Sequence, residues 1–174
     1  RRNCPGMILI RNPLDAAISW SIYTGTPLHH TLQYYEDYYS VLLPHVDRLF
    51  IVRFEDVVTD FGQVTRAFNT RWNTAYKCFT NTPENTSFCM SQIDNDFRLA
   101  DGTIKEACVP RPSPERRARK QALAAEAANS PKCRESARRA RDMYEAFRAA
   151  ARNNTAGDHE HSAHGNRQPV TSRQ

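Results

Sequence analysis

The chain has 174 residues, of which 40% are hydrophobic and 25% are charged, and this balance excludes a wholly disordered protein. Its formal charge is +5, from 24 Lys and Arg residues against 19 Asp and Glu residues. The longest apolar run, Met7-Ile8-Leu9-Ile10, is strand-sized and falls far short of the ~20 residues that a membrane-spanning helix needs. Length and composition therefore predict one domain with a tail and no membrane segment.

A strand followed by two helices is predicted at the start of the chain. Residues 7–10 lack alternation, which is typical of a parallel strand covered on both faces. The run stops at Arg11, and Asn12-Pro13 has the pattern of a helix N-cap followed by proline at the first helical position. This helix is expected to end at Gly25. A second helix is expected over residues 31–43, with a tyrosine stripe that indicates packing.

A second strand is expected over residues 49–52, before a helix over residues 61–68 that Asp60 or Thr59 would cap. Strand, helices, strand and helix in this order predict an α/β fold with a parallel sheet. In such sheets ligands bind at the carboxyl ends of the strands, and Arg11 and Phe54 both follow such ends.

The rest of the chain is predicted to be a loop region, two helices and a tail. Residues 70–112 show weak periodicity, which favours a long ordered loop or a lid. Ser113-Pro114 and Ser130-Pro131 each predict a helix start. The second of these helices has a docking face formed by Ala140, Met143, Tyr144, Phe147 and Ala151. From residue 153 no apolar periodicity remains, so we expect residues 153–174 to be disordered.

The five cysteines are widely spaced and form no Cys-x-x-Cys pair, which argues against a zinc ribbon. Because their number is odd, a fully paired disulfide framework is excluded, although one bridge among Cys78, Cys89 and Cys108 stays open. The His-rich residues 158–164 are of a type that binds divalent metals adventitiously, and no dedicated metal site is expected.

The residues after the first strand form a constellation suited to an anion. A guanidinium at the end of a strand, at Arg11, precedes the exposed N–H groups of a helix start, and Ser19 lies about two turns further on. Phosphate is the usual occupant of such sites. The alternative is a structural arginine that caps a turn, with Ser19 as an ordinary helix residue.

The pattern Arg11-Asn12-Pro13-x-Asp15-x-x-x-Ser19 resembles the 3′-phosphate-binding motif of the sulfotransferases that use 3′-phosphoadenosine 5′-phosphosulfate (PAPS). In that family the arginine and the serine at this spacing bind the 3′-phosphate of the donor. The resemblance therefore implies these roles for Arg11 and Ser19.

Two further segments resemble the same family. Phe54-Glu55-Asp56 resembles a strand end that usually carries Tyr-Glu-Asp, which implies a place near the adenine for Phe54. Thr86-Ser87-Phe88 resembles the family's segment that packs on the adenine ring, and implies that role for these residues. The family's later Arg-Lys-Gly, which also contacts the 3′-phosphate, is absent; Arg116 is the first candidate for its role and Arg111 the competitor.

Two parts of the family's active site have no counterpart in this sequence. The glycine-containing phosphosulfate loop with its lysine, and the histidine or glutamate base, should both precede the Arg-Asn-Pro motif. The sequence also begins Arg1-Arg2-Asn3, without Met. We therefore interpret it as the C-terminal part of a domain of about 250 residues, which binds the donor but does not turn it over alone.

These observations predict a P-loop NTPase-like parallel sheet with flanking helices over residues 1–152, without the N-terminal strands. The predicted function is transfer of a sulfuryl group from PAPS to a hydroxyl or amine of unidentified class, without a metal. The alternative is non-enzymatic anion or nucleic-acid binding through the Arg-rich helices near Arg116 and Arg138. A kinase-like P-loop protein that uses ATP is the third hypothesis. We favour the first because its three motifs occur in family order, so nucleic acid is not the expected partner.

Overall fold

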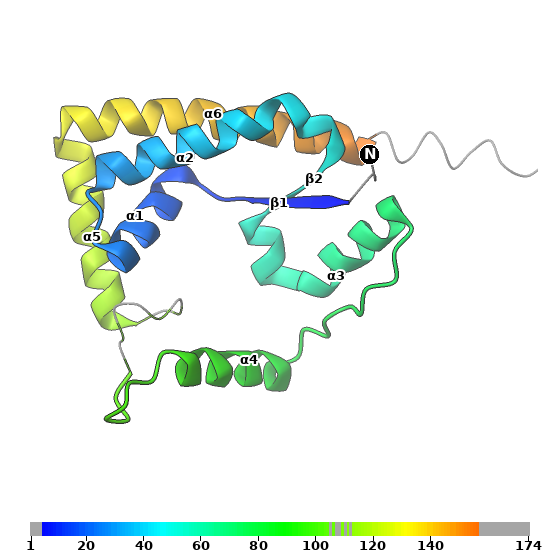
Figure 1. Cartoon of the computed structure of the whole chain (residues 1–174), viewed down its shortest axis with the longest axis horizontal. Helices are drawn as coiled ribbons and strands as arrows, with labels where there is room; N and C mark the ends of the chain where they lie inside the picture. Colours follow the sequence, from blue (N-terminus) through cyan, green and yellow to red (C-terminus); the bar gives the residue numbers. More distant parts are fainter. Residues whose placement is uncertain (1–4, 105, 107–108, 110, 112, 157–174) are drawn as a thin grey trace, which may run out of the picture.

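The computed structural model describes residues 5–104, 106, 109, 111 and 113–156. It is a mostly helical α/β structure with a small parallel sheet of two strands (Figure 1). The elements in chain order are β1 (Gly6–Ile10), α1 (Pro13–Thr24), α2 (Leu28–Leu42), the 3₁₀ helix η1 (Leu43–Arg48), β2 (Leu49–Arg53), α3 (Phe54–Trp72), α4 (Pro83–Asp96), α5 (Pro114–Asn129) and α6 (Pro131–Ala156).

The two strands pair in parallel, and their register places Ile10 beside Arg53 at the carboxyl end. One face of the sheet, with Ile8 and Ile10, is buried in the core with α2 and α6. On the other face Phe50 meets Phe68 of α3 edge to face, with the ring centroids 5.5 Å apart. The sheet therefore lies between α2 and α6 on one side and α3 on the other, as Figure 1 shows.

Two tyrosines of α2 attach this helix to the end of β1. The Tyr39 hydroxyl donates a hydrogen bond to the carbonyl oxygen of Leu9 at 2.6 Å, and Tyr35 donates to that of Arg11 at 2.9 Å. Burial raises the pKa of both phenols, that of Tyr39 to about 12, so both stay protonated donors at neutral pH. The prediction that the tyrosine stripe serves packing is confirmed for these two buried residues.

Helix α6 closes the core over α2. Phe147 is fully buried and contacts Tyr39 edge to face, with centroids 5.2 Å apart. At the rim of this contact the Arg139 guanidinium donates to Glu36 and Gln33 of α2, each at 2.9 Å. The docking face predicted for this helix is confirmed by these contacts and by the full burial of Ala140.

Most of the predicted element boundaries are confirmed. Asn12 caps α1, Gly25 ends it in a left-handed conformation, and Ser113 caps α5 through the backbone N–H of Arg116. Helix α2 begins at Leu28, directly after Pro27 and three residues before the expected start. Helix α6 runs to Ala156, so residues 153–156 of the expected tail are helical, and residues 157–174 lie outside the described part.

Of two expectations for the middle of the chain, the cap at Asp60 is confirmed and the long loop over residues 70–112 is wrong. Helix α3 begins at Phe54 instead of residue 61, with a kink at Asp60, whose carboxylate accepts a hydrogen bond from the backbone N–H of Gln63 at 2.9 Å. The cap at Asp60 thus begins only the second part of a longer helix. Residues 70–112 contain the end of α3 and all of α4, which Thr82 and Pro83 begin with the same cap-and-proline device as α5.

Among the described cysteines, Cys78, Cys89 and Cys133 are free thiols, so no bridge joins Cys78 to Cys89. Cys4 and Cys108 lie outside the described residues. Within the same residues, no helix combines the length and the hydropathy that crossing a bilayer requires.

We expect Phe147→Ala to destabilise the chain by about 3–5 kcal/mol, because it leaves a cavity between α6 and Tyr39. Urea denaturation followed by circular dichroism measures this change. Arg141→Ala, at an exposed position of the same helix, is the matched control and should change the unfolding free energy by less than about 0.5 kcal/mol. Equal midpoints for the two variants would contradict the central place of this contact.

Candidate functional site

The carboxyl ends of the two strands bring Arg11 and Phe54 together. Because Ile10 and Arg53 are neighbours in the register, the next residue of each strand emerges at the same edge of the sheet. The Arg11 guanidinium lies over the Phe54 ring, with its central carbon 4.3 Å from the ring centroid. This cation–π contact holds a positive charge at the carboxyl ends of the two strands, the edge at which open parallel sheets bind ligands.

The start of α1 lies directly beside Arg11, but its N–H groups are not open to a ligand. The Asn12 side-chain oxygen accepts hydrogen bonds from the backbone N–H groups of Leu14, at 3.0 Å, and Asp15, at 3.3 Å. Asp15 adds a negative charge to the first turn. The expectation that exposed helix N–H groups bind the anion is therefore wrong, and the attraction must come from side-chain cations.

Ser19 lies six residues after Pro13, the first residue of α1, which is a rise of about 9 Å along the helix axis. Its side chain is half-buried, and no hydrogen bond to its hydroxyl is found within the described residues. The structure therefore leaves this hydroxyl available to a ligand. It shows no direct contact between Ser19 and Arg11.

Helix α5 packs against α1 and brings further positive charge to the site. Arg116, in its first turn, is buried to 8% exposure. Lys120 follows one turn later and is half-buried. Its pKa is lowered from the ordinary value of 10.5, first by burial and then by the charges of Arg11 and Arg116, while Asp15 opposes the shift.

Among the described residues, the charges of Arg11, Arg116 and Asp15 all act on Lys120, so these four residues form a cluster with three basic side chains and one acidic side chain. An anion would relieve both the repulsion and the cost of burial, so this arrangement is suited to phosphate or sulfate. The sequence motifs indicated Arg11 and Arg116 as binding residues but not Lys120. Lys120 follows Arg116 by four residues, a spacing that places both side chains on one helix face. This spacing is the signal that could have identified Lys120.

Arg111 does not belong to this cluster. Its guanidinium donates to Asp94 at 2.5 Å and to Glu106 at 2.7 Å, and these hydrogen bonds raise its pKa. Because two carboxylates compensate its charge, Arg111 links the end of α4 to the segment before α5. The prediction that it could bind a phosphate is not supported by this geometry.

Thr86, Ser87 and Phe88 also lie away from the cluster. They belong to α4, which has no buried residue and lies apart from α1 and the sheet in Figure 1. All three are exposed, and the Phe88 side chain is 64% exposed. The structure therefore does not bring the expected adenine-binding segment to Arg11 and Phe54.

Half of the other basic side chains described on α5 and α6 are paired with carboxylates. Arg119 pairs with Glu115, Arg138 with Glu135 and Asp142, Arg139 with Glu36 and Glu135, and Arg148 with Glu145, whereas Arg117, Lys132, Arg134 and Arg141 form no ion pair within the described residues. The pairs at helical spacing place carboxylates among the basic residues of both helices. No group of three or more potential metal ligands occurs among the described residues, and the His-rich residues 158–164 lie outside them.

Comparisons of the chain with protein-family models, with curated proteins and with solved structures each find no match. A functional assignment therefore depends on the motifs and on the geometry of the cluster.

Proposed function

We propose that the cluster of Arg11, Arg116 and Lys120 binds the 3′-phosphate of PAPS, and that the chain is the donor-binding part of a sulfotransferase. The proposal is carried by one observation: α5 packs on α1, which brings Arg116 and Lys120 near enough to Arg11 for the charge of Arg11 to lower the pKa of Lys120. The sequence motif at residues 11–19 resembles the family's 3′-phosphate motif at this same place.

Five positions would hold the donor. Arg11 and Arg116 would bind the 3′-phosphate as fixed guanidiniums, and Lys120 would add a third charge. The half-buried Ser19 would donate its hydroxyl from two turns along α1. Phe54 would lie beside the adenine, as the resemblance of Phe54-Glu55-Asp56 to the family's strand end implies.

PAPS supplies the sulfuryl group, and the residues described here contribute binding and orientation. The small parallel sheet, with its ligand site at the carboxyl ends of the strands, is compatible with a P-loop-like fold, which is part of this proposal. The acceptor would be a hydroxyl or an amine. No residue of the cluster is assigned as the base that takes its proton.

The ion pairs on α5 and α6 favour this proposal over nucleic-acid binding, because phosphate-backbone recognition needs uncompensated cations along an extended surface. Arg138, the centre of that alternative, contacts two carboxylates. The ATP hypothesis differs from the PAPS proposal in one property: a PAPS site needs a 3′-phosphate on its ligand, and an ATP site does not.

We expect Arg11→Ala to weaken binding of adenosine 3′,5′-bisphosphate about 10- to 100-fold, because charge-assisted hydrogen bonds contribute about 1.5–3 kcal/mol each. Isothermal titration calorimetry measures this affinity, and AMP serves as the ligand without a 3′-phosphate. Arg48→Ala, at an exposed arginine of η1, is the control and should bind like the wild type. Equal wild-type affinities for the two nucleotides would contradict the proposal and favour a nucleotide site indifferent to the 3′-phosphate.

Ser19→Ala should weaken the same binding about 2- to 10-fold, since a neutral hydrogen bond contributes about 0.5–1.5 kcal/mol. Ser91→Ala is the control, because this hydroxyl donates to the Phe88 carbonyl on the distant helix α4. The affinity for AMP should not change in either variant. A loss of AMP affinity in Ser19→Ala would indicate a contact to another part of the nucleotide.

The affinity for adenosine 3′,5′-bisphosphate should fall as the pH rises through the lowered pKa of Lys120, because the free site then loses one positive charge. A bound phosphate restores the protonated form, so binding takes up a proton at alkaline pH. Calorimetry in buffers of different ionisation enthalpy detects this uptake. Lys120→Met should abolish it, whereas Lys77→Met, at an exposed position, should retain it. Proton uptake that persists in Lys120→Met would assign the titration to another group.

A further inference from the structure

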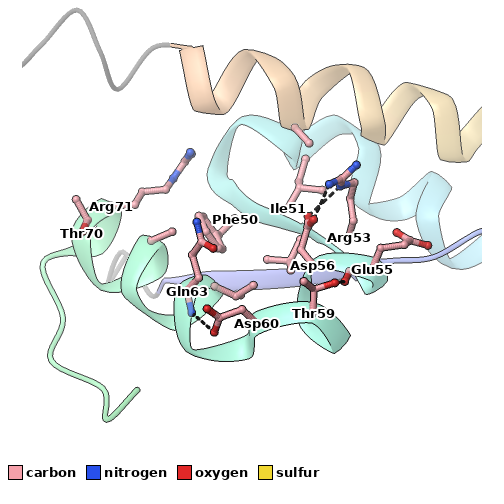
Figure 2. Close-up of a pocket in the computed structure, with 14 residues that line it drawn as sticks. Phe50, Ile51, Arg53, Glu55, Asp56, Thr59, Asp60, Gln63, Thr70 and Arg71 are labelled. Atoms are coloured by element: carbon pink, nitrogen blue, oxygen red, sulfur yellow. Dashed lines mark hydrogen bonds and ion pairs between the residues drawn. The ribbon is translucent and has the colours of Figure 1, made fainter. Parts of the chain in front are cut away.

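A groove of about 660 Å³ runs along β2 on the side away from β1 (Figure 2). Four consecutive residues of the strand, Phe50, Ile51, Val52 and Arg53, line it. Because successive side chains of a strand point to opposite faces, a groove lined by all four follows the edge of the strand and not one face.

This edge of β2 is open within the described residues. The sheet has two strands, and β1 occupies the other edge of β2. No described strand pairs with the backbone groups that face the groove. An open edge of this kind is a template for the addition of another strand.

The walls of the groove come from two helices and carry apolar residues between polar ones such as Thr59, Gln63 and Thr70 of α3. Val64 and Ala67 of α3 line one side, and Ala151 of α6 lines the other. Val52 and Val64 are themselves buried, so they form a fixed floor, whereas Ala67 is exposed toward the solvent. Small side chains at the rim leave room for the side chains of an added strand.

Opposite charges mark the two ends of the groove. Glu55 lies at the carboxyl end of β2, and its carboxylate forms no ion pair within the described residues. Arg71 lies at the other end, where its guanidinium donates to the carbonyl of Asp47 at 3.4 Å. Figure 2 shows these two residues at opposite ends of the row of lining side chains. Asp56, the acidic residue next to Glu55 in the sequence, already forms an ion pair with Arg53.

We propose that this groove binds an extended peptide segment, which adds to the open edge of β2 as a third strand. The backbone of the peptide pairs with β2, its apolar side chains pack on Val52, Val64 and Ala67, and a basic and an acidic side chain meet Glu55 and Arg71. A strand of five residues such as β2 spans about 17 Å, so the recognised segment has five to seven residues. This site is separate from the phosphate cluster.

Two synthetic heptapeptides test the proposal, Lys-Val-Thr-Val-Thr-Val-Glu and the reverse order. Glu55 lies at the carboxyl end of β2 and Arg71 at the other end. A peptide that adds antiparallel should therefore carry Lys first and Glu last, as in the first peptide, and a peptide that adds parallel should have the reverse order. With the ¹⁵N-labelled full chain, one of the two should bind saturably and shift the amide resonances of residues 50–53. If neither binds, or if an N-methylated version of the better peptide binds equally well, strand addition is excluded.

Ala67→Trp fills the groove from an exposed position and should weaken binding of the better peptide at least about tenfold. Ala122→Trp, at an exposed position of α5 outside the groove, is the matched control and should leave the affinity unchanged. Glu55→Lys should weaken binding, and a peptide whose Lys is replaced by Glu should restore it. Light scattering tests the competing occupant: a concentration-dependent dimer that Ala67→Trp abolishes would show that a second copy fills the groove and would overturn the proposal.

Discussion

Two phenolic hydroxyls on one face of α2 hold the end of β1 in place, and the rest of the structure is arranged around that attachment. Tyr39 and Tyr35 donate to carbonyls on either side of Ile10, so the strand leaves the sheet in a fixed direction. Tyr39 also contacts Phe147 of α6, so the position of α6 affects the same end of β1. The direction of the Arg11 side chain thus depends on the packing of two helices that carry no part of the cluster of Arg11, Arg116, Lys120 and Asp15.

The electrostatics of the cluster follow from this arrangement. Because Asn12 occupies two N–H groups of the helix start and Asp15 adds a negative charge, the helix itself offers little to an anion. The positive field comes from Arg11 and from α5, which packs on both α1 and α6. A site that combines residues from the end of β1 and from α5 depends more on how these elements pack together than on either element alone.

The sequence predicted those parts of the structure that depend on local signals. Asn12-Pro13 and Ser113-Pro114 correctly marked two helix starts, because capping is decided within four residues. The same local signal correctly marked Asp60, which caps the helical residues after it, while the helical segment over residues 54–59 before the kink was not expected. The place of Lys120 beside Arg11, and the capture of Arg111 by two carboxylates, depend on tertiary packing that spacing along one chain does not encode.

The stacked pair of Arg11 and Phe54 has a consequence for the order in which a nucleotide could be accepted. The guanidinium covers one face of the aromatic ring, so this face is already in use before any base arrives. A purine that sought the same face would have to exchange with the guanidinium and lose a contact of about 0.5–2 kcal/mol. A ligand whose phosphate first draws Arg11 away from the ring would free that face for its own base, and a nucleobase without a phosphate would find it closed.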